Sequence, residues 1–213
     1  MAVGEQEQAL GEGLKGRLWK TRGSRFVARE RLRATNTISI TTVTMLSVYV
    51  VISSVVLLAF SDDLNDLNEK WLNVTNIGLS ILIIVFSLIE ASRDHLGAAE
   101  TMSNSALAIG RIYGELSAKI DGRTLDVEGL LKMEADYADV LRESRLNHST
   151  LDYFAFKLQK PKDFPEDSWI QNKLYRAAAT VYIGIRNYWL YITALSAFPV
   201  LVAIFGSRLL AVA

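Results

Sequence analysis

Residues 146–154, "LNHSTLDYF", bring together three residue types that serve in catalysis: His148, Ser149 and Asp152. A histidine activates a serine nucleophile when a carboxylate orients it. On a helix, His148 and Asp152 share one face, whereas Ser149 points about 100° away. We therefore interpret His148 and Asp152 as a structural imidazole and carboxylate pair, and we predict no catalytic residues.

Arg142 and His148 form a second arrangement with chemical potential, because they enclose five residues of a predicted helix. The spacing resembles the arginine and histidine motif of HEPN ribonucleases, in which the pair acts at the scissile phosphate across a dimer. The general need of RNA cleavage for a positioned base adds no support beyond this spacing. A HEPN-like ribonuclease effector that uses Arg142 and His148 is kept as an alternative function.

Metal and cofactor chemistry finds little support in the composition. The 213 residues include no cysteine and only two histidines, which lie about fifty positions apart. Zinc sites are built from clustered cysteine and histidine ligands. We also find no glycine-rich phosphate loop, and we expect neither a metal site nor a cofactor.

Three runs of the chain lack any charged residue: 34–61, 71–89 and 187–207, of about 28, 19 and 21 residues. A helix needs about 20 apolar residues to cross the hydrocarbon of a bilayer. Trp71 opens the second run and Trp189 lies near the start of the third, as is typical of interfacial aromatic residues. We predict transmembrane spans over about 38–60 and 72–90, and a third transmembrane helix within 187–213.

Basic residues set the expected orientation. Eight lysines and arginines lie within residues 15–33, where Glu30 is the only acidic residue, whereas the link after the first span is mostly acidic. The positive-inside rule predicts a multi-pass inner-membrane protein whose N-terminus is cytoplasmic. Four of the basic residues are predicted to contact anionic lipid headgroups, and nucleic acid is not the expected partner. They are Arg22, Arg25, Arg29 and Arg33.

Hydroxyl and amide side chains recur at helical spacing within the first two spans. The predicted faces are Thr41, Thr44 and Ser47 in the first span, and Asn76, Ser80 and Ser87 in the second. Lipid tails offer these groups no hydrogen-bonding partner, so such faces turn toward another helix or toward water. Close helix packing and a polar path through an oligomer both remain open.

The remaining segments predict helices throughout. Apolar residues keep helical spacing from Ile109 to the "DGRT" turn, and a second helix capped by Thr124 is expected to run past Leu151. Pro161 and Pro165 break this pattern, and a further helix from Asp167 or Ser168 leads into the third run.

The predicted fold is all-α, an integral membrane helical hairpin with a cytoplasmic helical hairpin and a third C-terminal span. The segments are a basic cytoplasmic segment at 1–35, the transmembrane hairpin at 36–90, the cytoplasmic helices at 91–186 and the third span at 187–213.

The order of these features resembles the SLATT family, the two-transmembrane effectors associated with SMODS nucleotidyltransferases and SLOG proteins. The resemblance covers about residues 14–160. It depends on "TRxxRFxARERL" at 21–32, the hairpin with its acidic link, the helix pair, and "NHSxxDYxxFK" at 147–157. The chain is most similar to the subgroup linked to reverse transcriptases.

This resemblance implies a non-catalytic membrane effector of a prokaryotic antiviral or conflict system that acts by abortive infection. Such a protein is expected to form homo-oligomers and to permeabilise the membrane when a partner sensor fires, either a nucleotidyltransferase or a reverse transcriptase system. His148, Asp152 and Tyr153 are then the residues predicted to couple the signal. A passive membrane anchor or assembly partner is the remaining alternative.

Overall fold

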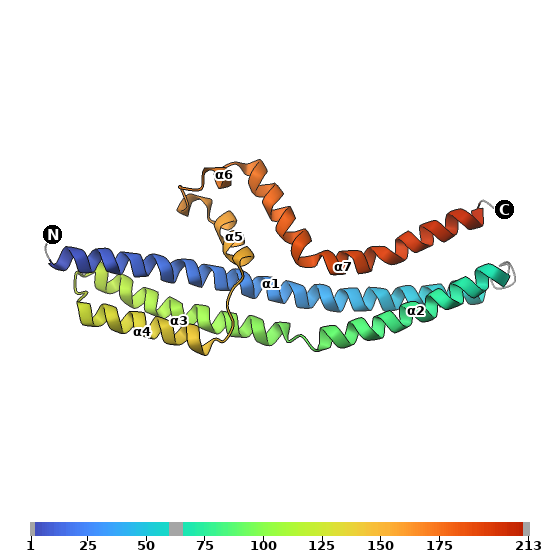
Figure 1. Cartoon of the computed structure of the whole chain (residues 1–213), viewed down its shortest axis with the longest axis horizontal. Coiled ribbons are helices and arrows are strands. Elements are labelled where there is room, and N and C mark those ends of the chain that lie inside the picture. The colour runs from blue at the N-terminus through green and yellow to red at the C-terminus, as the bar shows by residue number, and fades with distance from the viewer. Residues whose placement is uncertain (1–2, 60–65, 211–213) are drawn as a thin grey trace. The chain divides into compact units, whose positions relative to one another are not determined.

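The computed structural model describes the backbone of residues 3–59 and 66–210, and the side chains of residues 6–59 and 69–196 (Figure 1). Every regular element within these ranges is helical, which confirms the all-α prediction. The chain divides into two compact units. Unit 1 comprises residues 1–33 and 95–184, and unit 2 comprises residues 34–94 and 185–213. The predicted basic segment thus folds together with the helices that were predicted to be cytoplasmic.

The helices are α1 (Val3–Ala59), α2 (Asp66–Ala91), α3 (His95–Asp121), α4 (Val127–Glu143), α5 (Thr150–Gln159), α6 (Ser168–Gln171) and α7 (Lys173–Leu210). A short 3-10 helix, η2 (Pro161–Asp163), lies between α5 and α6. The long helices α1 and α7 each contribute residues to both units.

Unit 1 has a core in which α1 packs against the antiparallel pair α3 and α4. The predicted helix pair is confirmed, although α4 is capped by Asp126 rather than Thr124. The Asp126 carboxylate accepts a hydrogen bond from the Gly129 N–H at 3.1 Å, which satisfies a free donor of the first helical turn. The core side chains are Leu14, Leu18, Ile109, Ile112, Leu116, Leu125, Leu130 and Met133.

The second helix of the pair ends earlier than predicted. It stops at Glu143, and Arg145 adopts a left-handed conformation with φ of 47°. Ser149 then starts α5 through a capping box with Asp152, in which each side chain bonds the other residue's backbone N–H. The expectation of one helix running past Leu151 was wrong, because this local capping ends the helical run and begins a new one.

Helix α5 and the segment after it close the other side of unit 1. Phe164 is fully buried, and its ring lies 5.7 Å from that of Trp19 and 6.0 Å from that of Phe156. Aromatic packing therefore attaches α5 and the segment after it to α1.

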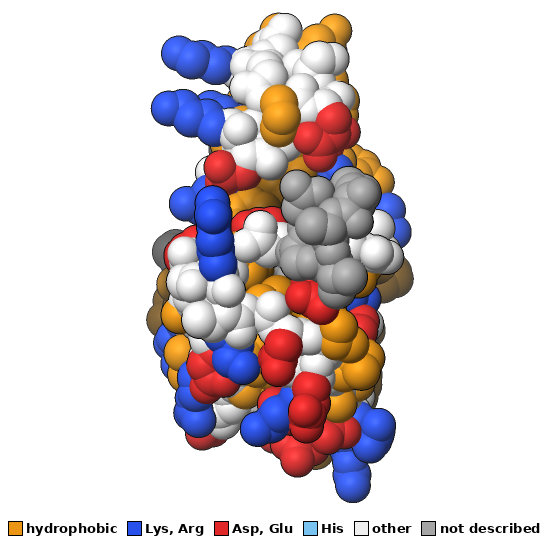
Figure 2. Space-filling view, turned by 90° about the vertical axis from the view of Figure 1, so that its left-hand side faces the viewer, with side chains coloured by type: hydrophobic (Ala, Val, Ile, Leu, Met, Phe, Trp, Pro, Cys, Tyr) orange, Lys and Arg blue, Asp and Glu red, His pale blue; other side chains and the backbone are white. Residues whose placement is uncertain are grey.

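Lysines and arginines are interspersed with acidic side chains over the face shown in Figure 2. This face therefore presents mixed charge to solvent.

Unit 2 holds the apolar parts of two described helices that are long and apolar enough to cross a membrane. Within the described residues, α1 and α2 each have an 18-residue apolar window, of which 11% and 0% is buried. Core helices of soluble proteins bury such windows, whereas a lipid-facing helix leaves them exposed. The third predicted span lies in α7, but its side chains after Ser196 are outside the described residues, so that span stays a prediction.

Candidate functional site

The Asp152 carboxylate of α5 is buried and fully engaged in hydrogen bonds. It is 1% exposed and accepts two bonds from Arg31, Nε to Oδ1 at 2.7 Å and Nη2 to Oδ2 at 3.1 Å. The Ser149 N–H and hydroxyl each donate to Oδ2 at 2.8 Å. Burial alone would raise the pKa of Asp152, but the bonds from Arg31 and Ser149 outweigh it and hold that pKa below its usual value. The carboxylate therefore ties the start of α5 to α1.

His148 does not form the predicted pair with Asp152. His148 lies in the non-helical segment before α5, and its backbone N–H donates a hydrogen bond to Asn147 Oδ1 at 2.9 Å. Burial, and then the positive charge of Arg25, lower the pKa of His148. The prediction was wrong because the helix on which it depended is interrupted between α4 and α5.

Tyr153, the third residue predicted to couple a signal, helps to hold α5 in place. Its ring lies 6.3 Å from that of Phe164 in a T-shaped arrangement, and Lys157 Nζ lies 5.2 Å from the Tyr153 ring centre. Lys157 also donates to Asp167 at 2.5 Å. The structure thus brings Asp152 and Tyr153 together on α5, whereas their predicted signalling role stays a prediction.

Arg142 and His148 do not lie on one helix, which was the arrangement that suggested the ribonuclease motif. Arg142 lies in the last turn of α4, its side chain is 79% exposed, and it pairs with Asp139 at 3.1 Å. The turn at Arg145 separates it from His148. The two residues therefore do not share the single helix that suggested the motif.

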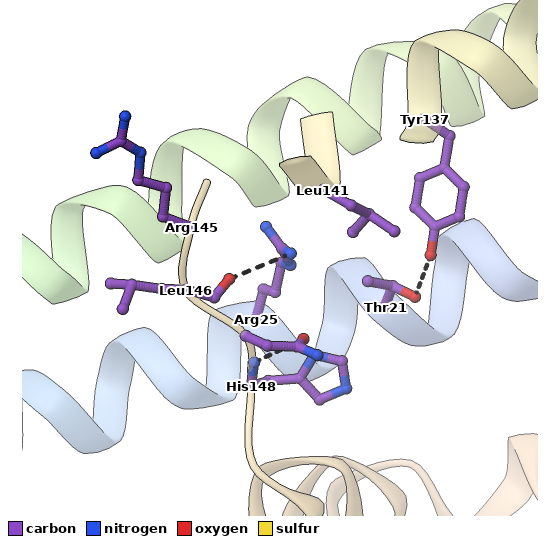
Figure 3. A pocket seen from close by; sticks show the side chains of 8 residues that line it. Thr21, Arg25, Tyr137, Leu141, Arg145, Leu146 and His148 are labelled. Atoms are coloured by element: carbon purple, nitrogen blue, oxygen red, sulfur yellow. Dashed lines mark hydrogen bonds between the residues drawn. The ribbon is translucent and has the colours of Figure 1, made fainter. Parts of the chain in front are cut away.

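A cavity of about 280 Å³ lies beside His148, between α1, α4 and the segment that follows α4 (Figure 3). Arg25 reaches into it from α1, and Tyr137 and Thr21 close one end through a 2.8 Å hydrogen bond between their hydroxyls. Arg25 is 1% exposed, and its Nη2 makes a long 3.5 Å bond to the Leu146 carbonyl oxygen. Burial lowers the pKa of its guanidinium.

Arg25 was predicted to contact lipid headgroups, and its burial contradicts that prediction. A signal in the sequence could have shown this, because Leu14, Leu18 and Arg25 follow one another at steps of four and seven residues. Such steps place them on one helix face.

The other three arginines of the predicted lipid-facing group differ among themselves. Arg22 and Arg29 are half-buried, whereas Arg33 is exposed. The Arg22 guanidinium lies 5.7 Å from the Phe26 ring, and Arg29 pairs with Glu30 at 3.3 Å. Of this group, Arg33 keeps the surface position that headgroup contact needs.

In unit 2, the hydroxyl face of the first span lies away from the buried side of α1. Thr41, Thr44 and Ser47 are exposed, and each donates to a carbonyl of its own helix four residues earlier, at 2.9 Å. The buried side consists instead of Thr35, Ser39, Thr42 and Leu46. At 100° per residue, Thr44 lies about 180° from Thr35.

The polar face of the second span turns partly toward α1. Asn76 Nδ2 donates to Ser54 Oγ of α1 at 2.7 Å. Ser80 and Ser87 are half-buried, and donate to the carbonyl oxygens of Asn76 at 2.8 Å and Ile83 at 2.7 Å. This geometry favours helix packing for the second face, while the first face is left without a neighbour among the described side chains.

A buried polar cluster that sequence reasoning missed lies at the end of α2. Glu90 and Tyr191 are 8% and 3% exposed, and the Tyr191 hydroxyl donates to Glu90 Oε2 at 2.9 Å. Arg93 pairs with the other carboxylate oxygen of Glu90 at 2.9 Å. Glu90 and Tyr191 are separated by 101 positions, so no local sequence pattern indicated their contact.

The chain matches a known protein family. The model of SMODS and SLOG-associating 2TM effector domain family 5 matches residues 8–205. No curated protein and no solved structure matches the chain. The match extends beyond residue 160 and includes most of the third apolar run. The family name specifies two transmembrane segments, which equals the number of candidate spans found among the described residues. The chain therefore belongs to the SMODS and SLOG-associating 2TM effector domain family 5.

Proposed function

We propose that copies of this membrane effector assemble in the prokaryotic inner membrane, with the N-terminus cytoplasmic, and permeabilise it when a partner sensor acts on unit 1. Its family associates with SMODS and SLOG proteins, which makes a SMODS nucleotidyltransferase or a SLOG protein the natural source of the signal. Permeabilisation of an infected cell's membrane would stop phage production.

The exposed hydroxyl face of α1 is the observation on which this proposal rests. The surrounding side chains suit acyl chains, for example Val51 at 61% and Leu58 at 81% exposure. Thr41, Thr44 and Ser47 interrupt this apolar surface on the side opposite the buried face. Their hydroxyl hydrogens are used within the helix, but their oxygens can still accept bonds from a neighbouring helix or from water. A second copy, or a water-filled path between copies, would supply these partners.

The continuity of α1 supports a link between the sensor contact and the membrane. The same helix carries Leu14 and Leu18 of the unit 1 core and Thr41 and Thr44 of the first span. A signal shifts an equilibrium only when it favours one arrangement over another. A partner that prefers one packing of α1 in unit 1 would thereby bias the orientation of the hydroxyl face.

Membrane potential during triggered expression tests the proposal. Wild-type chain should collapse the potential reported by a voltage-sensitive dye within the period of toxicity. Thr44→Leu, Ser80→Leu and Ser87→Leu should block the collapse while protein levels stay constant. Val74→Leu is the matched control, because Val74 is 61% exposed on the apolar side of α2, and it should behave as wild type.

The same experiment separates permeabilisation from the two alternatives, a ribonuclease and a passive anchor. Toxicity with an intact potential would refute permeabilisation. RNA cleavage lost in both Arg142→Ala and His148→Ala would instead establish the ribonuclease. Co-purification with a partner and no effect on either potential or RNA would point to a passive anchor.

A further inference from the structure

Arg25 carries a buried charge that the described part of the chain does not balance. Its Nε and Nη1 are buried and make no hydrogen bond, and its Nη2 has only the long contact to the Leu146 carbonyl. The Asp152 carboxylate is engaged by Arg31. A buried guanidinium without an anion is costly, so this arrangement is expected where an anion from elsewhere completes the site.

The cavity beside Arg25 has the lining that an anion needs. Of the described residues that line it, none is acidic, and Arg145 adds a second cation at its edge. His148 Nδ1 is buried and without a partner, so the imidazole can donate from this nitrogen. In Figure 3 the Arg145 side chain points away from Arg25, which leaves Arg25 as the cation directed into the cavity.

We propose that this cavity binds the phosphate group of a small molecule, with Arg25 as its principal ligand. The Arg25 fork, the paired hydroxyls of Thr21 and Tyr137, and His148 approach from α1, α4 and the segment after α4. One hydroxyl hydrogen is used in the bond between Thr21 and Tyr137, which leaves the other for a ligand. Donors that converge from several directions suit the tetrahedral oxygens of a phosphate better than the two coplanar oxygens of a carboxylate. About 280 Å³ is larger than a phosphate group alone, so part of an organic substituent fits as well.

This inference deepens the proposed function, on which its regulatory meaning rests. The bound group would join α1 to the segment that leads through Ser149 into α5, and both carry contacts of Asp152. Occupancy would then favour one arrangement of α1 in unit 1. The binding itself can be measured without any membrane readout.

Thermal unfolding of the full chain in phosphatidylcholine nanodiscs tests the site. At constant ionic strength, replacing chloride with millimolar inorganic phosphate or AMP should raise the Tm of the wild type by about 2–4 °C. Arg25→Met keeps most of the side-chain length, and should abolish this rise and weaken AMP binding in equilibrium dialysis at least tenfold. Arg111→Met removes an exposed cation of α3 and should keep the full rise.

Arg25→Met should also change the Tm in chloride, in the absence of phosphate. Because methionine removes an unbalanced buried charge, Arg25→Met should melt above the wild type in chloride. A variant that melts below the wild type in chloride, or that keeps the phosphate-dependent rise, would overturn the proposal. A rise seen only in nanodiscs containing phosphatidylglycerol would assign the phosphate group to a lipid headgroup rather than to a free ligand.

The two proposals fail separately. A chain that binds phosphate but leaves the membrane potential intact keeps the site and loses permeabilisation. A chain that collapses the potential but shows no phosphate-dependent rise loses the site alone.

Discussion

Gly23 permits the contact between α1 and α5. A Cβ added at Gly23 would overlap the ring of Phe156, whereas a Cβ at Gly16 of the same helix would have no atom within 4 Å. Gly23→Ala should therefore destabilise the chain by about 1–3 kcal/mol, because the aromatic contacts of α5 must shift. Gly16→Ala should stabilise it by up to about 1 kcal/mol through helix propensity. Thermal melting in detergent compares the two, and equal effects would refute the close approach.

The Asp152 carboxylate should make stability depend on pH in the acid range. Its pKa is lowered in the folded chain, so its stabilisation is present above the unfolded pKa of about 3.9 and is lost as the pH falls through the folded pKa. At pH 7, Asp152→Asn should cost on the order of 3 kcal/mol, since it removes the buried negative charge that accepts hydrogen bonds from Arg31 and Ser149. The difference from wild type should shrink below about pH 4. Asp136→Asn, at an exposed position on α4, is the control, and melting curves from pH 3 to pH 7 measure both.

At the level of single residues, the sequence contained signals of local relations that our prediction overlooked, and no signal of distant ones. Ser149 and Asp152 stand at capping-box spacing, and the structure forms that box. Arg31 binds Asp152 from 121 positions away, which no helical period could reveal. The burial of Arg25 was predictable from its spacing to Leu18, but the count of basic residues near the membrane favoured the opposite interpretation.

The helix α7 is attached to α2 by a buried hydrogen bond that should be measurable. Removing the hydroxyl with Tyr191→Phe leaves Glu90 Oε2 without this donor and should cost about 1.5–3 kcal/mol, as for a bond to a charged group. Tyr175→Phe is the matched control, because Tyr175 is 61% exposed on the same helix. Thermal melting in nanodiscs checks the difference, and indistinguishable Tm values for the two variants would contradict the attachment.

The existence of helices was easier to predict than their ends. Long charge-free runs and regular apolar spacing gave the two candidate spans and the pair α3 and α4. The break between Glu143 and Thr150 was missed, because apolar residues on both sides happen to keep one period. Side chains that cap locally decide such a boundary, and they compete with the periodic signal.

The orientation of the whole chain in the membrane can be mapped with single cysteines, since the natural sequence has none. With the N-terminus cytoplasmic, a membrane-impermeant maleimide added to intact spheroplasts should label Lys70→Cys and spare Glu143→Cys. Permeabilised cells should label both. If the third run also crosses, Ala213→Cys should be labelled from outside. Labelling of Glu143→Cys in intact spheroplasts would reverse the predicted topology.

Helix α1 continues over 57 residues through the boundary between the two units, and in a helix each residue turns the chain by about 100°. One residue inserted near position 33 would therefore turn all later side chains by about 100° relative to all earlier ones, whereas seven inserted residues would turn them by only about 20°. Toxicity that is lost with one inserted residue and restored with seven would show that function depends on the azimuth of the hydroxyls as well as on their chemistry.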